Sequence, residues 1–288
     1  KQDLFDKVLR HTSEAFAEDP VRVLRVARFR ARFGPEWAVA KETRFLIKGM
    51  AKHGVLDELT PERIWKELSR ALMEPFPRLF FDTLLQCDAL HKLFPEVYKL
   101  LAALEGLYWH PEGNAYEHTM LCLTVAAKMN YSLATRYRVL VHDFGKGLTP
   151  FNLLPSHHGH DINGVAVAEA FGNRLKVPSN ILTSSLKTTR HHMLMHNLDT
   201  LKAKTFVKLF DDLKTPEAVQ ALYEVGVCDE RGRLGYENNA IDQLSLIFSK
   251  YAAYKSVRFD DVFPHGETDP EKIKATMARE RIKVINNV

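Results

Sequence analysis

Apolar side chains recur every three or four residues along nearly the whole chain, and this spacing constrains the fold more than any other feature. Residues three and four apart share one face of a helix, so the spacing predicts amphipathic helices. The clearest early segments are residues 4–9, 21–33, 42–50, 61–73, 77–87 and 95–107. No stretch alternates apolar and polar residues as a half-buried strand does. We therefore predict an all-α fold.

Capping residues and breaks in the pattern organise these helices. Thr60 before Pro61 and Asp19 before Pro20 have the residue types preferred at helix starts. Gly, Pro and Trp interrupt the pattern near 105–113, and a second interruption lies near 232–239. We therefore expect three helical regions, at 1–107, 108–238 and 239–288.

The bulk properties exclude some classes of protein. No apolar run reaches the roughly 18 residues that a membrane span needs, so no membrane partner is expected. The net charge of +4 does not by itself indicate nucleic acid. Cys87, Cys122 and Cys228 show no CxxC spacing, which predicts reduced, buried thiols in a cytoplasmic protein. The chain lacks an initiator Met and a signal-peptide pattern, so we expect it to be a piece of a longer protein.

A row of arginines follows the first capped helix start. Arg22, Arg25, Arg28 and Arg32 cover about one third of the helix circumference at roughly 100° per residue. Guanidinium groups held in this way can bind phosphates or base edges, and Asp19 could accept from a base amino group. The alternative is a solvated amphipathic helix with Asp19 acting only as its N-cap.

Histidines and aspartates form a second group. His142 and Asp143 end an apolar helix predicted at 134–141, His118 begins another, and Asp229 lies in the later segment 227–233. A mixed nitrogen and oxygen set suits Mn, Ni, Fe, Co or Zn better than Ca, and such a site assists phosphoester hydrolysis. Each histidine taken alone is more often a structural residue.

The arginine segment resembles a family motif. Residues 18–29 closely resemble the EDxxR motif of bacterial CCA-adding enzymes, which are tRNA nucleotidyltransferases, and residues 59–67 resemble the next motif of that family. The resemblance implies that Asp19, Arg22, Arg25 and Arg28 bind the incoming CTP or ATP. It also implies tRNA as a partner.

The histidine segments resemble the HD phosphohydrolase domain of gamma-proteobacterial CCA-adding enzymes. The resemblance implies a neck and body bundle at 1–107, an HD-type domain at 108–238 and a helical tail at 239–288. It implies hydrolysis of 2′,3′-cyclic nucleotides, 2′-nucleotides and other phosphomonoesters with Ni, Mn or Co. The implied metal ligands are His118, His142, Asp143 and Asp229.

The same resemblance suggests roles around the metal. Lys146 would contact the phosphate, and we place it with His142, Asp143 and His160 among the catalytic residues. His158 and His192, like His160, are candidates to bind phosphate, hold a second metal or donate a proton to the leaving oxygen.

One departure from the family limits the prediction. The family's catalytic head, with paired aspartates for Mg, does not occur in this sequence. We therefore expect the C-terminal portion of a tRNA nucleotidyltransferase, retaining the phosphohydrolase but not adding nucleotides alone. The alternatives are a tRNA-binding module with a vestigial HD site and a free-standing HD phosphohydrolase.

Overall fold

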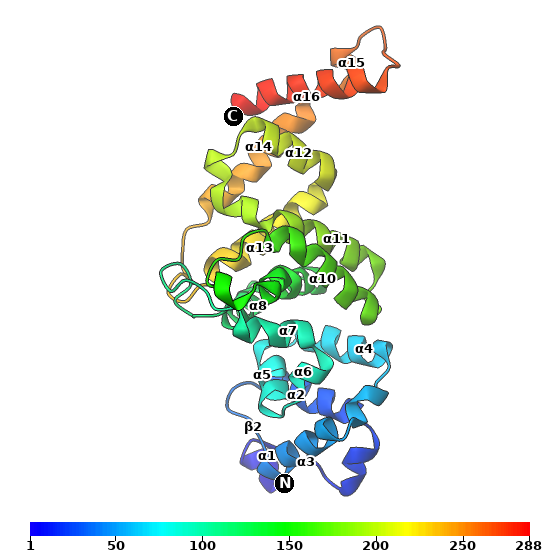
Figure 1. Ribbon diagram of the computed structural model, residues 1–288, viewed down its shortest axis with the longest axis vertical. Helices are drawn as coiled ribbons and strands as arrows, with labels where there is room; N and C mark the ends of the chain where they lie inside the picture. The colour runs from blue at the N-terminus through cyan, green and yellow to red at the C-terminus, as the bar shows by residue number, and fades with distance from the viewer. The chain divides into compact units, whose positions relative to one another are not determined.

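The computed structural model describes all 288 residues, and helices dominate it, which confirms the all-α prediction (Figure 1). The chain forms two compact units. Unit 1 comprises Lys1–Arg190 and Cys228–Asn238, and unit 2 comprises His191–Val227 and Asn239–Val288. The predicted boundaries after residues 107 and 238 come from breaks in the sequence pattern, and they stay a prediction. No helix is long and apolar enough to span a membrane.

Unit 1 contains the elements that carry most of the predicted site residues. Its α-helices are α1 (Gln2–Phe5), α2 (Val21–Phe33), α3 (Lys41–Lys52), α4 (Pro61–Leu72), α5 (Arg78–Gln86), α6 (Leu90–Leu93), α7 (Pro95–Lys99), α8 (Ala115–Lys128), α9 (Leu133–Val141), α10 (His160–Arg174) and α11 (Ser179–His191). Short 3-10 helices lie between them: η1 (Glu14–Glu18), η2 (Val55–Glu58), η3 (Leu100–Ala102), η4 (Phe144–Leu148) and η5 (Phe151–Leu153). The end of α13 (Pro216–Arg231) also belongs to this unit.

The arginine-bearing helix α2 packs against α4 and α5. Its apolar face is fully buried at Val23, Leu24, Ala27 and Ala31. Burying a Val or Leu side chain contributes about 1.5–3 kcal/mol, so this face fixes which way the arginines point. Thr60 and Pro61 begin α4 as predicted, although the Thr60 side chain makes no capping hydrogen bond.

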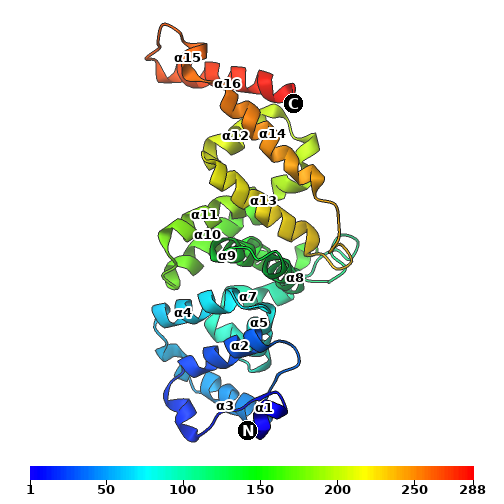
Figure 2. The same cartoon turned by 180° about the vertical axis from the view of Figure 1, so that it is seen from behind.

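The histidine-bearing elements pack closely in the same unit. Helix α8 contacts α9 (Figure 2). The 3-10 helix η4 contacts α10. Gly145 in η4 lies so close to α10 that a Cβ at this position would collide with the backbone of His160 and Gly164. Only glycine permits this approach, which brings the residues beside Gly145 next to the start of α10.

Unit 2 has its own apolar core. Helices α12 (Ala203–Leu213), α14 (Leu246–Ser256) and α16 (Pro270–Asn286) contact one another, and α15 (Phe259–Val262) packs on α16. The 3-10 helices η6 (His192–Thr200) and η7 (Asp242–Ser245) complete the unit with residues 216–227 of α13. Phe206, Phe210 and Ile247 are fully buried at its centre.

Two predicted helices are wrong in part. The run at 4–9 ends at Phe5, and β1 (Val8–Leu9) pairs in parallel with β2 (Ala38–Val39), because Lys7 adopts a left-handed φ of 54°. The run at 95–107 leaves the helix after η3. There the backbone pairs across a loop instead, since Glu105 N–H donates to the Gly113 carbonyl. Tertiary hydrogen bonds override the local pattern in both places.

Candidate functional site

The predicted metal ligands meet inside unit 1. We call His118, His142, Asp143 and Asp229 the histidine–aspartate cluster. His118 lies in the first turn of α8, His142 and Asp143 follow α9, and Asp229 lies near the end of α13. All four are buried. Asp229 Oδ1 lies 2.9 Å from His118 Nε2, and Asp143 Oδ2 lies 3.3 Å from His142 Nε2 and 3.8 Å from His118 Nε2.

Three histidines of this region, His118, His142 and His160, share one hydrogen-bonding pattern. His142 Nδ1 lies 2.7 Å from the Val139 carbonyl oxygen, and His160 Nδ1 lies 2.8 Å from the His157 carbonyl oxygen. Both rings can donate from Nδ1, which leaves Nε2 facing the aspartates. His118 does the same, with Nδ1 2.9 Å from Glu112 Oε1. Metal-binding histidines are commonly held in this way by an acceptor on the other nitrogen.

The charges of the site suit a divalent cation. Carboxylates of Glu105, Glu112, Asp143 and Asp229 are buried together, and Lys146 pairs with two of them, Glu105 and Asp143. Two carboxylates flank His118 at 2.9 Å, so its Nε2 needs either a proton or a metal ion between it and Asp229. The donor set therefore fits a metal ion by chemistry.

The pKa shifts follow from the same packing. Burial works against the charged forms, but attraction to His142 and Lys146 holds the pKa of Asp143 well below its usual value. Burial likewise opposes charge on Lys146, yet Asp143 and Glu105 raise the pKa of its ammonium. The pKa of His160 is also raised against burial by its contact with Asp143. Asp143 therefore stays ionised and Lys146 stays protonated.

Three residues that lie near the cluster, Cys122, Glu105 and Glu112, were not identified from the sequence. Cys122 Sγ joins His118, His142 and Asp229 in a group whose ligand atoms all lie within 4.8 Å of one another. Its position four residues after His118 on one helix face was the available signal. Glu105 and Glu112 come from the loop between η3 and α8, and nothing in the sequence marked them. Lys146 Nζ lies 2.5 Å from Glu105 Oε1 and 2.7 Å from Asp143 Oδ2.

A pocket of about 490 Å³ opens beside the cluster. Gly145 and His160 line it together with residues of the segment between η4 and α10. His160 Nε2 lies 3.2 Å from Asp143 Oδ1, and His158 is exposed at the same pocket. His192 is buried in unit 2, as the first residue of η6, and its role stays a prediction.

Asp19 connects the two segments that resemble family motifs, because it lies in the first and contacts the second. Its Oδ1 accepts from Val21 N–H at 3.2 Å, as a helix cap does, and from Arg63 Nη2 at 2.7 Å. Burial raises the pKa of Asp19, but the hydrogen bonds from Val21 and Arg63 outweigh it and lower that pKa. Asp19 is therefore more than a cap, because Arg63 belongs to α4.

The arginines of α2 differ in their partners. Arg22 donates to the Ala15 carbonyl. Arg28, with a side chain 12% exposed, pairs with Glu67 at 2.8 Å and Glu74 at 3.3 Å. Arg25, at 50% exposed, reaches the buried Glu67 only at 3.7 Å. Of the predicted nucleotide-binding arginines, Arg25 and Arg28 thus pair with carboxylates of α4 and the turn after it, whereas Arg22 is held by a backbone carbonyl.

Two family models match the chain. Residues 38–101 match the family described as "Probable RNA and SrmB- binding site of polymerase A", and residues 115–216 match the HD domain family. The second match contains His118, His142 and Asp143, and Asp229 lies beyond it.

Curated relatives are similar over most of the chain. A multifunctional CCA protein of Acinetobacter baylyi is 42% identical over 266 residues, covering 91% of this chain and 64% of the relative. One from Shewanella denitrificans is 40% identical over 290 residues, covering 99% of this chain and 70% of the relative. The chain spans slightly less than two thirds of the Acinetobacter baylyi relative.

Solved structures share the fold. A CCA-adding enzyme with CTP superposes with a TM-score of 0.60 at 17% identity, over 99% of this chain and 60% of that one. A Thermotoga maritima CCA-adding enzyme complexed with tRNA gives 0.58 at 16% identity, over 100% and 62%.

Proposed function

Because the chain belongs to the family of multifunctional CCA proteins, we propose that its histidine–aspartate cluster holds a divalent metal ion and hydrolyses phosphoesters. One observation carries this proposal. His118, His142 and His160 are each hydrogen-bonded at Nδ1 and turn Nε2 toward buried carboxylates. A purely structural cluster has no need to align three imidazoles in this way.

Each residue has a proposed part in the reaction. His118, His142, Asp143 and Asp229 hold the ion, which polarises a phosphoryl oxygen and lowers the pKa of water when bound. Lys146 keeps its proton and offers positive charge to the phosphate. His160 holds a proton at Nε2, beside the pocket, and donates it to the leaving oxygen. The exposed His158 binds the phosphate at the mouth of the same pocket, and His192 is a further phosphate ligand in this proposal.

The substrates follow from the family. We propose 2′,3′-cyclic nucleotides, 2′-nucleotides and related phosphomonoesters, with Ni, Mn or Co as the metal. The full-length protein would build or repair the 3′ CCA end of tRNA, with Asp19, Arg22, Arg25 and Arg28 contacting CTP or ATP and Mg serving the head. Residues 1–107 would form its neck and body, 108–238 its HD domain and 239–288 its tail. The three cysteines are buried and form no disulfide, which agrees with a cytoplasmic location.

An assay of the chain tests the proposal directly. A 2′,3′-cyclic nucleotide is incubated with the metal-free chain, and then with Ni, Mn or Co added back. Hydrolysis should depend on the added ion and stop with excess chelator. If no ion restores hydrolysis, the cluster is vestigial and the chain acts as a tRNA-binding module. Equal hydrolysis with and without chelator would exclude a metal role.

A further inference from the structure

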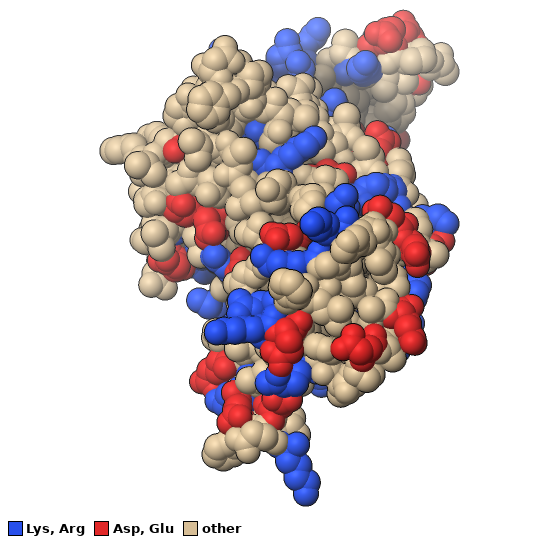
Figure 3. Space-filling model, turned by 60° about the horizontal axis from the view of Figure 1, so that its bottom comes forward, with Lys and Arg blue, Asp and Glu red and all other residues tan.

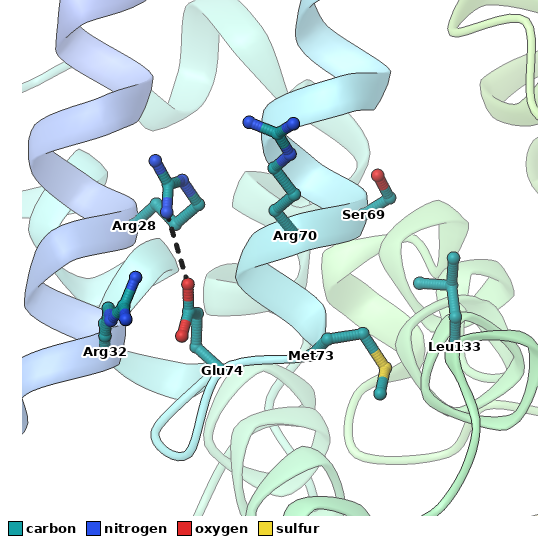
Figure 4. A pocket seen from close by; sticks show the side chains of 7 residues that line it. All are labelled: Arg28, Arg32, Ser69, Arg70, Met73, Glu74 and Leu133. Carbon is teal, nitrogen blue, oxygen red and sulfur yellow. Dashed lines mark hydrogen bonds and ion pairs between the residues drawn. The ribbon is translucent and has the colours of Figure 1, made fainter.

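A second pocket, of about 650 Å³, lies at the end of α2 away from Asp19. Arg28 and Arg32 come from α2, whereas Arg70 comes from α4 (Figure 4). Ser69, Met73, Glu74 and Leu133 complete its lining. We call it the Arg32–Arg70 pocket. Pockets of this size hold small organic groups, and this one combines guanidinium groups with apolar walls.

The pocket carries surplus positive charge. Glu74 pairs with Arg28, and the buried Glu67 pairs with Arg28 and Arg25. Arg70 is 55% exposed and reaches Glu67 only at 4.0 Å, while Arg32 is exposed and has no carboxylate within ion-pair distance. These four arginines therefore face two carboxylates, both of them held mainly by Arg28. On the face shown in Figure 3, basic and acidic groups lie interspersed.

Two guanidinium groups on different helices match the phosphates of nucleic acid. Arginine binds phosphate oxygens through paired N–H donors, and the apolar Met73 and Leu133 can contact sugar or base. Charge repulsion between Arg32 and Arg70 falls when an anion lies between them.

The position of the pocket favours a polynucleotide over a single nucleotide. At about 1.5 Å per residue, Arg32 lies roughly 15 Å along α2 from Arg22. A nucleotide centred on Asp19 and Arg22 does not extend to Arg32, whereas an RNA strand running along α2 can reach both ends. Arg28 lies between the two sites and lines this pocket. Ser69, Arg70, Met73 and Glu74 also lie within the segment that matches the RNA-binding family model.

We propose that the Arg32–Arg70 pocket binds a backbone phosphate of an RNA strand. The proposal rests on the proposed action of this family member on tRNA, and it assigns a place where the RNA is held. Arg32 and Arg70 supply the phosphate contacts. Arg28 is already paired with Glu67 and Glu74, so Arg32 and Arg70 are the guanidinium groups left for the phosphate.

Fluorescence anisotropy of a labelled tRNA lacking its CCA end tests this, with the intact chain at several salt concentrations. Arg32→Ala and Arg70→Ala should each weaken binding about three- to tenfold, and each should reduce the slope of log K against log salt by roughly 0.7–0.9. Arg70→Lys should retain the slope while recovering only part of the affinity, because it keeps the charge but not the planar fork. Lys52→Ala is the matched control, since Lys52 is an exposed cation of α3 outside the pocket.

Titrations with CTP and with inorganic phosphate separate the sources of phosphate. We expect CTP affinity to be the same in both alanine variants and in the unmodified chain. Loss of CTP binding without loss of tRNA binding would reassign the pocket to a nucleotide. If Lys52→Ala weakens tRNA binding as much as the pocket variants do, the weakening reflects general surface charge, and the proposal is wrong.

Two further outcomes separate this inference from the proposed function. If the unmodified chain binds tRNA and both alanine variants bind it equally well, the pocket is wrong and tRNA binding stands. If the unmodified chain does not bind tRNA, both the pocket assignment and the tRNA part of the proposed function fail. Metal-dependent hydrolysis and unchanged thermal unfolding verify that each variant is folded.

Discussion

The histidine–aspartate cluster and the Arg32–Arg70 pocket are both charged regions of unit 1, but they differ in solvent exposure. His118 is fully buried between two carboxylates, whereas Arg70 is 55% exposed and barely reaches one. A buried cluster must be neutralised by groups held in place around it. An exposed one is screened by water and ions. This difference agrees with our two proposals, a fixed ion in the first region and a reversibly bound partner at the second.

The largest expected effect lies in the buried cluster. Replacing Asp143 by Ala removes a carboxylate that contacts His142, His160 and Lys146. Metal-dependent hydrolysis should fall at least about 100-fold, which is the upper end reported for loss of a ligand's hydrogen-bond partner. The assay measures 2′,3′-cyclic nucleotide hydrolysis, with Asp57→Ala as the control at an exposed aspartate. Full activity of Asp143→Ala would place the reaction elsewhere.

The next effect concerns the residue that orients His118. Glu112 accepts from His118 and from His110, and despite burial these hydrogen bonds lower its pKa. Glu112→Ala should weaken metal affinity about 10- to 100-fold, and Glu112→Gln less, because an amide oxygen can still accept from His118. Competition with a metal-binding dye gives the affinity. If both variants bind the metal as tightly as the unmodified chain, Glu112 does not position His118.

A smaller effect, on nucleotide selectivity, is expected at the arginine row of α2. In a version of the protein that includes the catalytic head, Arg22→Ala should cost roughly 1–3 kcal/mol of C-versus-A discrimination, as a bidentate base contact does. Phosphohydrolysis should not change, because the histidine–aspartate cluster does not include Arg22. Both activities are measured on one preparation. Unchanged addition by Arg22→Ala would favour a merely solvated helix.

The smallest effects are on stability. Arg28→Ala leaves the buried Glu67 without its closest partner, and should lower the free energy of unfolding by about 1–3 kcal/mol. Arg25→Ala removes a half-exposed pair, and should change it by less than about 1 kcal/mol. Urea unfolding compares the two. Equal losses in the free energy of unfolding would mean that Arg25 and Arg28 contribute equally to stability despite their different exposure.

Prediction from sequence worked best where the chemistry was local. The adjacent His142 and Asp143, with His118 at a helix start, marked a site that the structure brings together with Asp229. Glu112 could not be found in this way. It reaches His118 because the loop after η3 closes by backbone pairing between Leu104 and Asn114, which no local pattern encodes.

The arginine row shows the same limit in another form. Helical periodicity placed Arg22, Arg25 and Arg28 on one face correctly, since the apolar face of α2 is buried. It could not show that Glu67, on a different helix, holds Arg28 and leaves Arg25 half-exposed. Such pairings depend on how α2 and α4 pack together, and their consequences for nucleotide binding remain predictions.

The central claim is that the histidine–aspartate cluster binds a divalent metal ion, and equilibrium dialysis tests it most directly. The metal-free chain is dialysed against Ni, Mn or Co and the bound ion is counted by mass spectrometry. We predict about one tightly held ion per chain, lost in Asp229→Ala and retained in Asp57→Ala, as expected for binding that requires a complete ligand set. No bound ion in the unmodified chain, or full retention in a folded Asp229→Ala variant, would contradict the account.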